Sequence, residues 1–268
     1  MEIGSFSRRC SKEAGDSDQE GKQCPLQAAY ASCYVWDRHR RPPNNSVVVY
    51  LGQFTGKSPA RQLLRQYGWG RMWSTYIELP EASDAEPLGF DCGAYTAWNK
   101  MTPLHWRDFP EEIFLRRLEA LPRVPDVAVV PDLPMAGNSS LSFSVSWRHQ
   151  LPNEFPWHLA VQDGVSMSLV EENIDHFTGL FLGGTGSFKL RAKEWCDLAH
   201  RHGKTFHYGR ASTYKRVREA RLMGADSLDS VSPVLRLADG DGPKRGPRAL
   251  FRWIEEATSQ NPQMELFL

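Results

Sequence analysis

The chain is constrained above all by a regular alternation of short apolar runs with amphipathic segments. The runs have the length of buried strands, and between them apolar residues recur three or four positions apart, as on one face of a helix. Strands that alternate with helices form right-handed βαβ units around a parallel sheet. The eight predicted strands are Val47–Leu51, Tyr76–Leu79, Leu88–Asp91, Val127–Pro131, His158–Gln162, Gly179–Leu182, Thr205–Tyr208 and Asp226–Asp229. The clearest helical spacings are Phe114, Leu118 and Leu121; Trp195, Leu198 and Ala199; and Leu250, Phe251, Ile254 and Ala257.

Eight strand–helix units fit one closed (β/α)8 barrel, which uses roughly 200–250 residues; the chain has 268. An open, doubly wound sheet is the alternative. The positions of the polar residues favour the barrel, because many of them stand at or just after the end of a predicted strand. In a barrel those ends converge on one mouth, where active sites lie. The sequence therefore predicts a single α/β domain, a TIM-type barrel, over residues 25–268.

Residues 1–24 are polar and charged, and we expect a disordered arm there. They contain no apolar signal-peptide core, which predicts a cytoplasmic protein. No apolar run approaches the ~18 residues of a membrane span, so no membrane partner is expected. The five cysteines form no CxxC pair, and no cofactor or structural metal is predicted.

Charge is balanced overall but uneven along the chain. Lys and Arg number 32, as do Asp and Glu, which excludes a uniformly basic nucleic-acid coat. Two basic segments, 200–221 and 242–252, nevertheless follow predicted strand ends. They are interpreted either as a phosphate-binding rim or as solvated outer helix faces. The residues predicted to bind nucleic acid are Arg210, Lys215, Arg216, Lys244 and Arg245.

Several strand ends carry groups suited to binding or catalysis. Asp91 ends a predicted strand and is followed by the turn residue Gly93, while Asp132 follows another strand. Either acid alone is as readily explained as a helix cap. Gln162 also ends a strand, and its amide can donate and accept together, as recognition of a purine-like edge requires. The double glycine Gly183–Gly184 can expose backbone N–H groups to a ligand.

The last predicted strand carries two acids three residues apart, Asp226 and Asp229. In a regular strand, residues at this spacing point to opposite faces. We expect Asp229, nearer the carboxyl end, to face the barrel mouth. His207 closes the preceding strand and is either a substrate contact or a satisfied histidine of the barrel rim.

The order of these motifs resembles the tRNA-guanine transglycosylase superfamily over about residues 47–236. In that family an Asp-x-Gly-Gly-Phe-like turn, a Gln-Gly/Asp-Gly strand end, an Ile-Gly-Gly-Leu-like turn, a Met-Gly-Val-Gly strand end and a Gly-x-Asp-x-x-Asp strand occur in sequence. The corresponding segments here are Asp91-Cys92-Gly93-Ala94-Tyr95, Gln162-Asp163-Gly164, Leu182-Gly183-Gly184-Thr185, His207-Tyr208-Gly209-Arg210 and Gly224-Ala225-Asp226-Ser227-Leu228-Asp229.

The resemblance implies a (β/α)8 barrel that exchanges guanine in a nucleic acid for a 7-deazaguanine base such as preQ0. It implies that Asp229 is the nucleophile at the ribose C1′ and that Asp91 is the acid and base acting on the departing and incoming bases. It implies that Asp132, Gln162 and the Gly183–Gly184 turn bind the base. Thr185, His207 and Gly209 complete the predicted set of substrate-binding residues.

The chain departs from the tRNA enzymes in three respects. It has no cluster of three Cys and a His near its C-terminus, Thr96 stands where their turn ends in Gln, and it is much shorter. These features resemble compact DpdA-type transglycosylases, which insert 7-deazaguanines into DNA and occur in phages and bacterial genomic islands. DNA is therefore favoured over tRNA as the partner. A metal-dependent barrel hydrolase and a non-catalytic nucleobase- or DNA-binding module are the other hypotheses.

Overall fold

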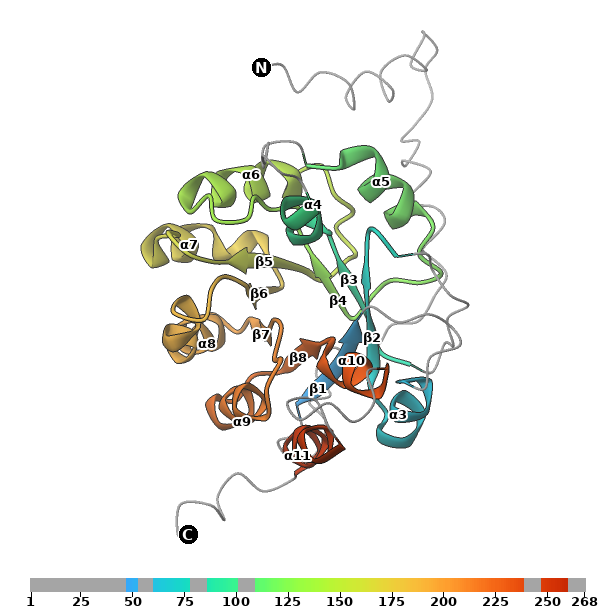
Figure 1. Ribbon diagram of the computed structural model, residues 1–268. Coiled ribbons are helices and arrows are strands. Elements are labelled where there is room, and N and C mark those ends of the chain that lie inside the picture. Colours follow the sequence, from blue (N-terminus) through green and yellow to red (C-terminus); the bar gives the residue numbers. More distant parts are fainter. Residues whose placement is uncertain (1–46, 53–59, 78–85, 101–108, 239–246, 260–268) are drawn as a thin grey trace, which may run out of the picture. The chain divides into compact units, whose positions relative to one another are not determined.

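The fold is a closed barrel of eight parallel strands, seen in a computed structural model that describes residues 47–52, 60–77, 86–100, 109–238 and 247–259. The strands hydrogen-bond in chain order, and the ring closes where Tyr50 pairs with Asp229. The predicted (β/α)8 TIM-type barrel is thereby confirmed (Figure 1). The predicted arm, residues 1–24, lies outside the described residues.

All predicted strands but one overlap an observed strand. In chain order the strands are β1 (Val48–Gly52), β2 (Gly70–Ser74), β3 (Leu88–Asp91), β4 (Val127–Val129), β5 (Trp157–Val161), β6 (Gly179–Leu182), β7 (Thr205–Tyr208) and β8 (Ser227–Ser230). The connection from β6 to β7 illustrates the repeating unit, since its helix packs against both strands that it joins.

The predicted strand Tyr76–Leu79 is wrong, because the second strand lies earlier in the chain, at Gly70–Ser74. The first two residues of the predicted run form a turn after β2, and the last two lie outside the described residues. The observed strand was not predicted because the charged residue Arg71 interrupts its apolar run. Its side chain is buried and forms an ion pair with Glu86 at 2.7 Å.

The major helices surround the ring of strands (Figure 1). They are α3 (Ala60–Tyr67), α4 (Ala94–Lys100), α5 (Glu111–Glu119), α6 (Asn138–Arg148), α7 (Met167–Asn173), α8 (Ala192–Arg201), α9 (Tyr214–Met223), α10 (Ser232–Ala238) and α11 (Pro247–Thr258). From α5 to α9 they follow one another in chain order, and α11 packs against α9. Two short 3-10 helices are η1 (Ile174–His176) and η2 (Phe188–Arg191).

Helix α9 begins and ends at residues whose chemistry suits those positions. The Thr213 hydroxyl caps its start by accepting a hydrogen bond from the Arg216 backbone N–H at 3.3 Å. Gly224 ends it in the left-handed region, with φ of +86°, which a residue without Cβ adopts readily. The cap fixes the connection from β7 to α9, which passes beside the barrel mouth.

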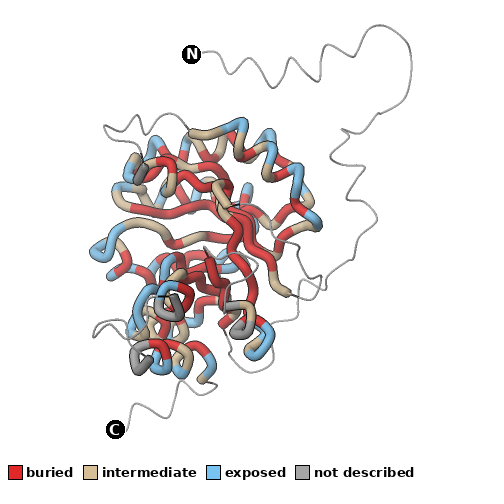
Figure 2. The backbone as a smooth tube through the Cα atoms, turned by 45° about the vertical axis from the view of Figure 1, so that its right-hand side comes forward, coloured by how far each residue is buried: buried red, intermediate tan, exposed pale blue. Residues whose placement is uncertain are grey.

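Burial follows the expected two layers, with the strands buried and the exposed residues on the outer helix faces (Figure 2). The apolar face predicted for the last helix is partly wrong, because Phe251 is 66% exposed. Trp253 takes the buried position instead. Its indole N–H donates to the Ala211 carbonyl at 2.9 Å, and its ring meets Trp69 edge to face. None of the described helices has the length and apolarity needed to cross a bilayer.

The barrel interior changes from apolar to polar toward the carboxyl ends of the strands. Tyr50 and Met72 form a buried cluster against which Phe181 packs. The His207 ring stacks on Phe181, with 4.6 Å between ring centroids. Beyond this layer the interior holds carboxylates, so the barrel supports a polar site on an apolar floor.

Candidate active site at the barrel mouth

Three acids meet at the carboxyl end of the barrel. Asp91 is the last residue of β3, Asp132 follows β4, and Asp229 lies in β8. The charges of the other two acids both raise the pKa of Asp91, which places Asp91 within electrostatic reach of each of them. The barrel thus brings together residues that are up to 138 positions apart in the chain.

Asp229 is buried, and its Oδ1 has two neighbours at the end of β7 and on the turn that follows. His207 Nε2 lies 3.2 Å from Oδ1, and the Arg210 backbone N–H donates to the same atom at 2.9 Å. Asp226 faces the other way, where its Oδ2 lies 2.9 Å from His200 Nε2. The two acids thus point to opposite faces, as the strand spacing predicts.

Asp91 is partly exposed at the mouth. Burial raises the pKa of its carboxyl to about 7, with a further rise from the negative charge of Asp132. A weak hydrogen bond at 3.4 Å from the Gly93 backbone N–H opposes this rise. A carboxyl group with such a pKa is able to hold a proton near neutral pH and then release it.

Asp132 is held by a side-chain hydrogen bond on each oxygen. The Cys92 thiol donates to Oδ1 at 3.3 Å, and the Gln162 amide donates to Oδ2 at 2.9 Å. Burial raises the pKa of the Asp132 carboxyl to about 6, and these two hydrogen bonds oppose the rise. Burial also raises the pKa of the Cys92 thiol, which therefore stays a donor.

Gln162 is buried behind Asp132 rather than open to the mouth. Its amide nitrogen also approaches the Leu133 carbonyl and the Ser140 hydroxyl, each at 3.0 Å. Its oxygen accepts from the Met135 backbone N–H at 2.9 Å. Gln162 thus organises the connection that carries Asp132, and its direct contact with a purine edge stays a prediction.

The turn after β6 is joined to the turn after β5 by hydrogen bonds. Asp163 accepts hydrogen bonds from both the backbone N–H and the hydroxyl of Thr185, each at 2.7 Å. Gly184 has φ of +73°, and a Cβ there would lie 2.6 Å from Asp163 Oδ2. Gly183 is partly exposed and precedes these hydrogen-bonded residues. The double glycine therefore lets two mouth loops approach closely.

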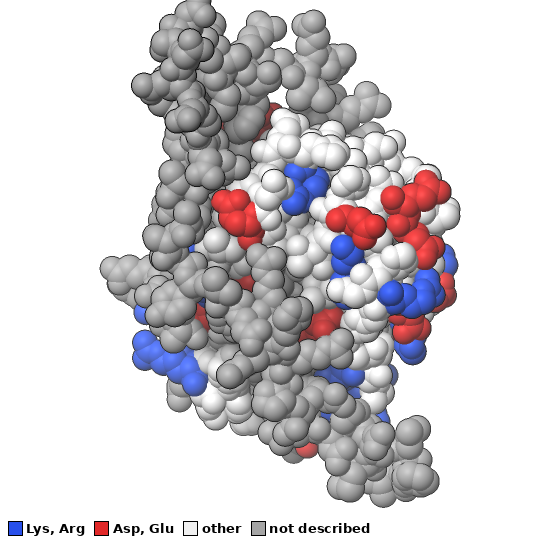
Figure 3. Space-filling view, turned by 180° about the vertical axis from the view of Figure 1, so that it is seen from behind, with Lys and Arg blue, Asp and Glu red and all other residues white. Residues whose placement is uncertain are grey.

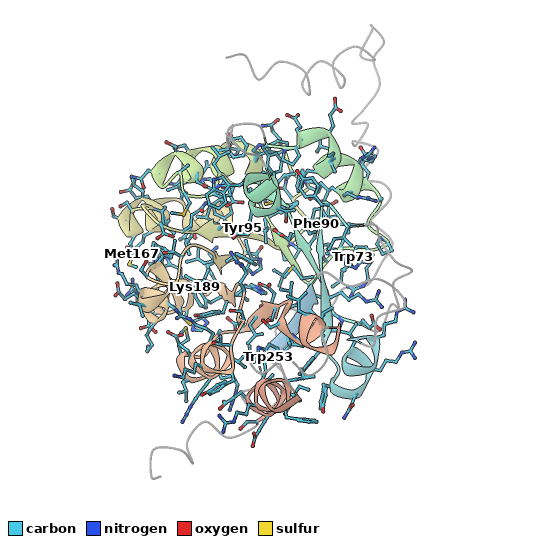
Figure 4. All side chains as sticks on the ribbon, in the orientation of Figure 1. Trp73, Phe90, Tyr95, Met167, Lys189 and Trp253 are labelled. Atoms are coloured by element: carbon cyan, nitrogen blue, oxygen red, sulfur yellow. The ribbon has the colours of Figure 1, made fainter. Side chains whose placement is uncertain are left out.

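A cation–aromatic pair that the sequence does not reveal spans the rim. The Arg210 guanidinium lies 4.2 Å from the centre of the Tyr95 ring, and both side chains are exposed. Tyr95 belongs to α4, directly after the Asp91 turn, and is labelled in Figure 4. An aromatic residue after a strand-end acid was a visible signal, but nothing in the sequence pairs it with Arg210.

A buried lysine was missed by the sequence reasoning. Lys189, in η2 and labelled in Figure 4, donates from Nζ to the Gly209 carbonyl. Burial lowers the pKa of this amine to about 8. A Cβ on Gly209 would lie 2.6 Å from the Leu182 carbonyl, so the turn leading to Arg210 is confined on two sides.

The predicted nucleic-acid-binding residues fall into three groups. Arg210 and Lys215 are exposed. Arg216 is engaged within the protein, donating to Glu219 at 2.7 Å and to the Gly186 carbonyl at 3.1 Å. Lys244 and Arg245 lie outside the described residues. Other basic side chains of the 200–221 segment form ion pairs: Arg201 with Glu171, Lys204 with Asp175, and Arg221 with Glu256.

Seen from behind, acidic and basic side chains lie side by side on the surface drawn in colour (Figure 3). Within the described ranges, no group of three or more His, Cys, Asp or Glu side chains is arranged to hold a metal ion. The sequence matches no protein-family model and no curated protein. The geometry of the mouth therefore carries the functional argument.

Proposed function

We propose that the protein is a base-exchange transglycosylase that replaces guanine in a nucleic acid, DNA in the first instance, with a 7-deazaguanine base. One observation carries the proposal. Asp229 and Asp91 approach one barrel mouth from different strands, one anchored on a single oxygen and the other with a pKa near 7. Two carboxyl groups in unlike environments can divide the work of nucleophile and acid–base catalyst.

The chemistry balances with these two acids alone. The Asp229 carboxylate attacks C1′, the C1′–N9 bond breaks with its electron pair moving to guanine, and Asp91 donates a proton to the departing base. Asp91 is then a carboxylate and removes a proton from the incoming base. That base attacks C1′, breaks the ester to Asp229 and leaves a nucleotide with a new base.

The rim suits a target base taken out of its stack. Extrusion costs roughly a few kcal/mol, and stacking on an exposed aromatic ring is a general means of offsetting that cost. Tyr95 offers such a ring beside Asp91. Arg210, whose backbone N–H reaches Asp229, and Lys215, in the first turn of α9, provide exposed positive charge for the phosphate backbone on the segment that follows β7.

The test is denaturing gel electrophoresis of the protein incubated with DNA or tRNA, with and without a deazaguanine base. The wild type should form a covalent nucleotide adduct and exchange labelled guanine. Asp229→Asn should abolish both. Asp226→Asn is the matched control, because the same change lies beside the same strand but faces away from the mouth.

The outcomes separate the hypotheses. Exchange on tRNA but not on DNA would show that the substrate is RNA, as for the tRNA-guanine transglycosylases. Activity retained in Asp229→Asn and lost in Asp226→Asn would reverse the assignment of the nucleophile. A wild type that forms no adduct and exchanges no base on either nucleic acid would remove the transglycosylase proposal.

A further inference from the structure

We infer that His207 and the backbone amide of Arg210 are positioning groups that anchor Oδ1 of Asp229 and leave Oδ2 as the attacking atom. The inference rests on the proposed function and names which oxygen reacts and what holds it. It also gives His207 a role different from the substrate contact that its position at a strand end suggests.

His207 is placed to touch the nucleophile but not a substrate. Its side chain is fully buried, and its ring lies parallel to Phe181 within 9°. Nδ1 is 2.8 Å from the Ser227 hydroxyl, and Nε2 is 3.2 Å from Asp229 Oδ1. Three neighbours thus fix the position and the rotation of the imidazole.

The hydrogen-bond partners of His207 determine which ring nitrogen carries the hydrogen. An ionised carboxylate accepts hydrogen bonds and donates none, so Nε2 must carry a hydrogen to bond with Asp229. The Ser227 hydroxyl both donates and accepts, so it satisfies Nδ1 in the neutral and in the charged ring. With Asp229 as the carboxylate that attack requires, His207 is the donor of this hydrogen bond.

The second donor comes from a strained turn. Arg210 has φ of +54°, and Met135 is the one other described non-glycine residue with positive φ. Strained backbone of this kind persists where the surroundings hold it in place. Lys189 bonds the preceding carbonyl of Gly209, and the Ala211 N–H donates to the backbone carbonyl of Asp229 at 2.8 Å. These contacts aim the Arg210 N–H at Oδ1.

The two oxygens of Asp229 consequently differ. Oδ1 has two neighbouring donors, whereas Oδ2 forms no hydrogen bond with any residue that the structure describes. Attack through Oδ2 makes an ester whose carbonyl oxygen is Oδ1, still within reach of both N–H groups. When the incoming base breaks the C1′–Oδ2 bond, the same donors receive the carboxylate in its original orientation.

The kinetic test compares His207→Leu with His207→Gln. Leu removes the donor and keeps the bulk, whereas Gln can place an amide N–H near the position of Nε2. We expect His207→Leu to lower kcat for guanine exchange about 100-fold, the range for loss of one preorganised donor, with KM nearly unchanged. His207→Gln should recover most of that loss.

The matched control is His158→Leu. His158 is the other buried histidine of the described barrel strands, and it bonds Thr205 and the Pro156 carbonyl rather than a mouth carboxylate. Its replacement should lower the melting temperature without the selective fall in kcat. A loss of kcat in His207→Leu that matches that of His158→Leu, or a loss that His207→Gln does not reverse, would contradict the inference.

The second measurement does not depend on activity. Long-range ¹H–¹⁵N NMR of the histidine rings in the full chain should show a protonated Nε2 on His207, and the Nε2 signal should shift in Asp229→Asn. An unprotonated Nε2 overturns the inference even if the wild type exchanges bases. A wild type that exchanges no base on DNA or tRNA overturns the proposed function, and the inference with it, whatever the ring signals show.

Discussion

At the scale of single residues, the mouth gives chemically identical side chains different surroundings. Burial and neighbouring charge raise the pKa of Asp91. Asp132 accepts hydrogen bonds on both of its carboxylate oxygens, whereas Asp229 accepts them on one oxygen only. An acid whose pKa lies near the working pH is suited to proton transfer, while a carboxylate anchored on one side is suited to attack.

The proton-donor role of Asp91 predicts a pH dependence. Its pKa of about 7 lies above the usual value for Asp, so the donor form prevails below pH 7 and disappears above it. The rate of covalent adduct formation without an incoming base should therefore fall about tenfold per pH unit above pH 7. Rapid-quench samples run on denaturing gels measure this rate, with Asp91→Asn as the slow, pH-independent control. A rate that rises with pH through this range would contradict the assignment.

The acids of the candidate site could be predicted from the sequence, because the apolar runs show where most of the strands end. Asp91, Asp132 and Asp229 all lie at the mouth, because residues at the carboxyl ends of barrel strands converge there. The partners of Tyr95 and Lys189 could not be found, because each side chain pairs with the turn at positions 209–210, across 20 or more positions of the chain. Such pairs depend on loop geometry that no local pattern encodes.

At the scale of elements, the loops of the mouth are joined to one another by specific hydrogen bonds. Thr185 binds Asp163 in the preceding loop, and Arg216 reaches from α9 to the Gly186 carbonyl. These links imply that a small change in one turn displaces its neighbour.

Gly184→Ala tests this coupling. The change adds strain at φ of +73° and a Cβ 2.6 Å from Asp163 Oδ2. Gly203→Ala is the matched control, because it has φ of +64° but nothing within 4 Å of the added Cβ. The control should lose about 1 kcal/mol of unfolding free energy from the backbone strain alone. Gly184→Ala should lose more and also lower exchange activity; equal losses in urea denaturation would show that the loops are not tightly joined.

Helix α8 and the residue before strand β8 are linked by a titrating pair outside the barrel. The hydrogen bond from Asp226 raises the pKa of His200 to about 10, with a smaller contribution from the Cys196 thiol. Because the folded-state pKa exceeds the unfolded value of 6.5, the stabilisation is complete below pH 6.5 and is lost as pH rises toward 10.

His200→Gln should therefore lower the melting temperature at pH 6 by roughly 2–4 °C, as expected for about 1 kcal/mol in a chain of this size. The difference from the wild type should vanish near pH 10. Differential scanning calorimetry at both pH values measures it. A deficit that is independent of pH would assign the effect to packing rather than to the ion pair.

The element scale also explains the error in the predicted strands. The apolar pattern found the strands whose residues are mostly uncharged, but β2 contains Arg71, whose charge is neutralised inside the protein by Glu86. A buried ion pair joins residues from separate segments, so a search along the chain treats each partner as exposed. Phe251 and Trp253 differ for a related reason, since both fit a helical face and only packing selects Trp253.

At the scale of the whole molecule, the alternation of strands and helices predicted a parallel sheet with crossover helices. The polar residues at the strand ends favoured a closed barrel over an open sheet, and the barrel is what the structure shows. The distribution of charge was less predictable. Much of the basic segment 200–221 is neutralised by acids from elsewhere in the chain, which leaves Arg210 and Lys215 as its exposed charges nearest the mouth.

These two side chains should therefore govern the salt dependence of nucleic-acid binding. The double variant Arg210→Gln, Lys215→Gln keeps the Arg210 backbone N–H on Asp229 while removing both charges. For single-stranded DNA, the slope of log affinity against log salt should decrease in magnitude by about 0.7 for each phosphate that the variant no longer neutralises. Arg191→Gln, Lys193→Gln is the control, because those cations are exposed and paired with acids of helix α8, Glu194 and Asp197. Fluorescence anisotropy at graded salt distinguishes the cases: equal slopes in both double variants would place the nucleic acid on another face, whereas a smaller slope in the first alone would locate its backbone at the rim beside Asp229.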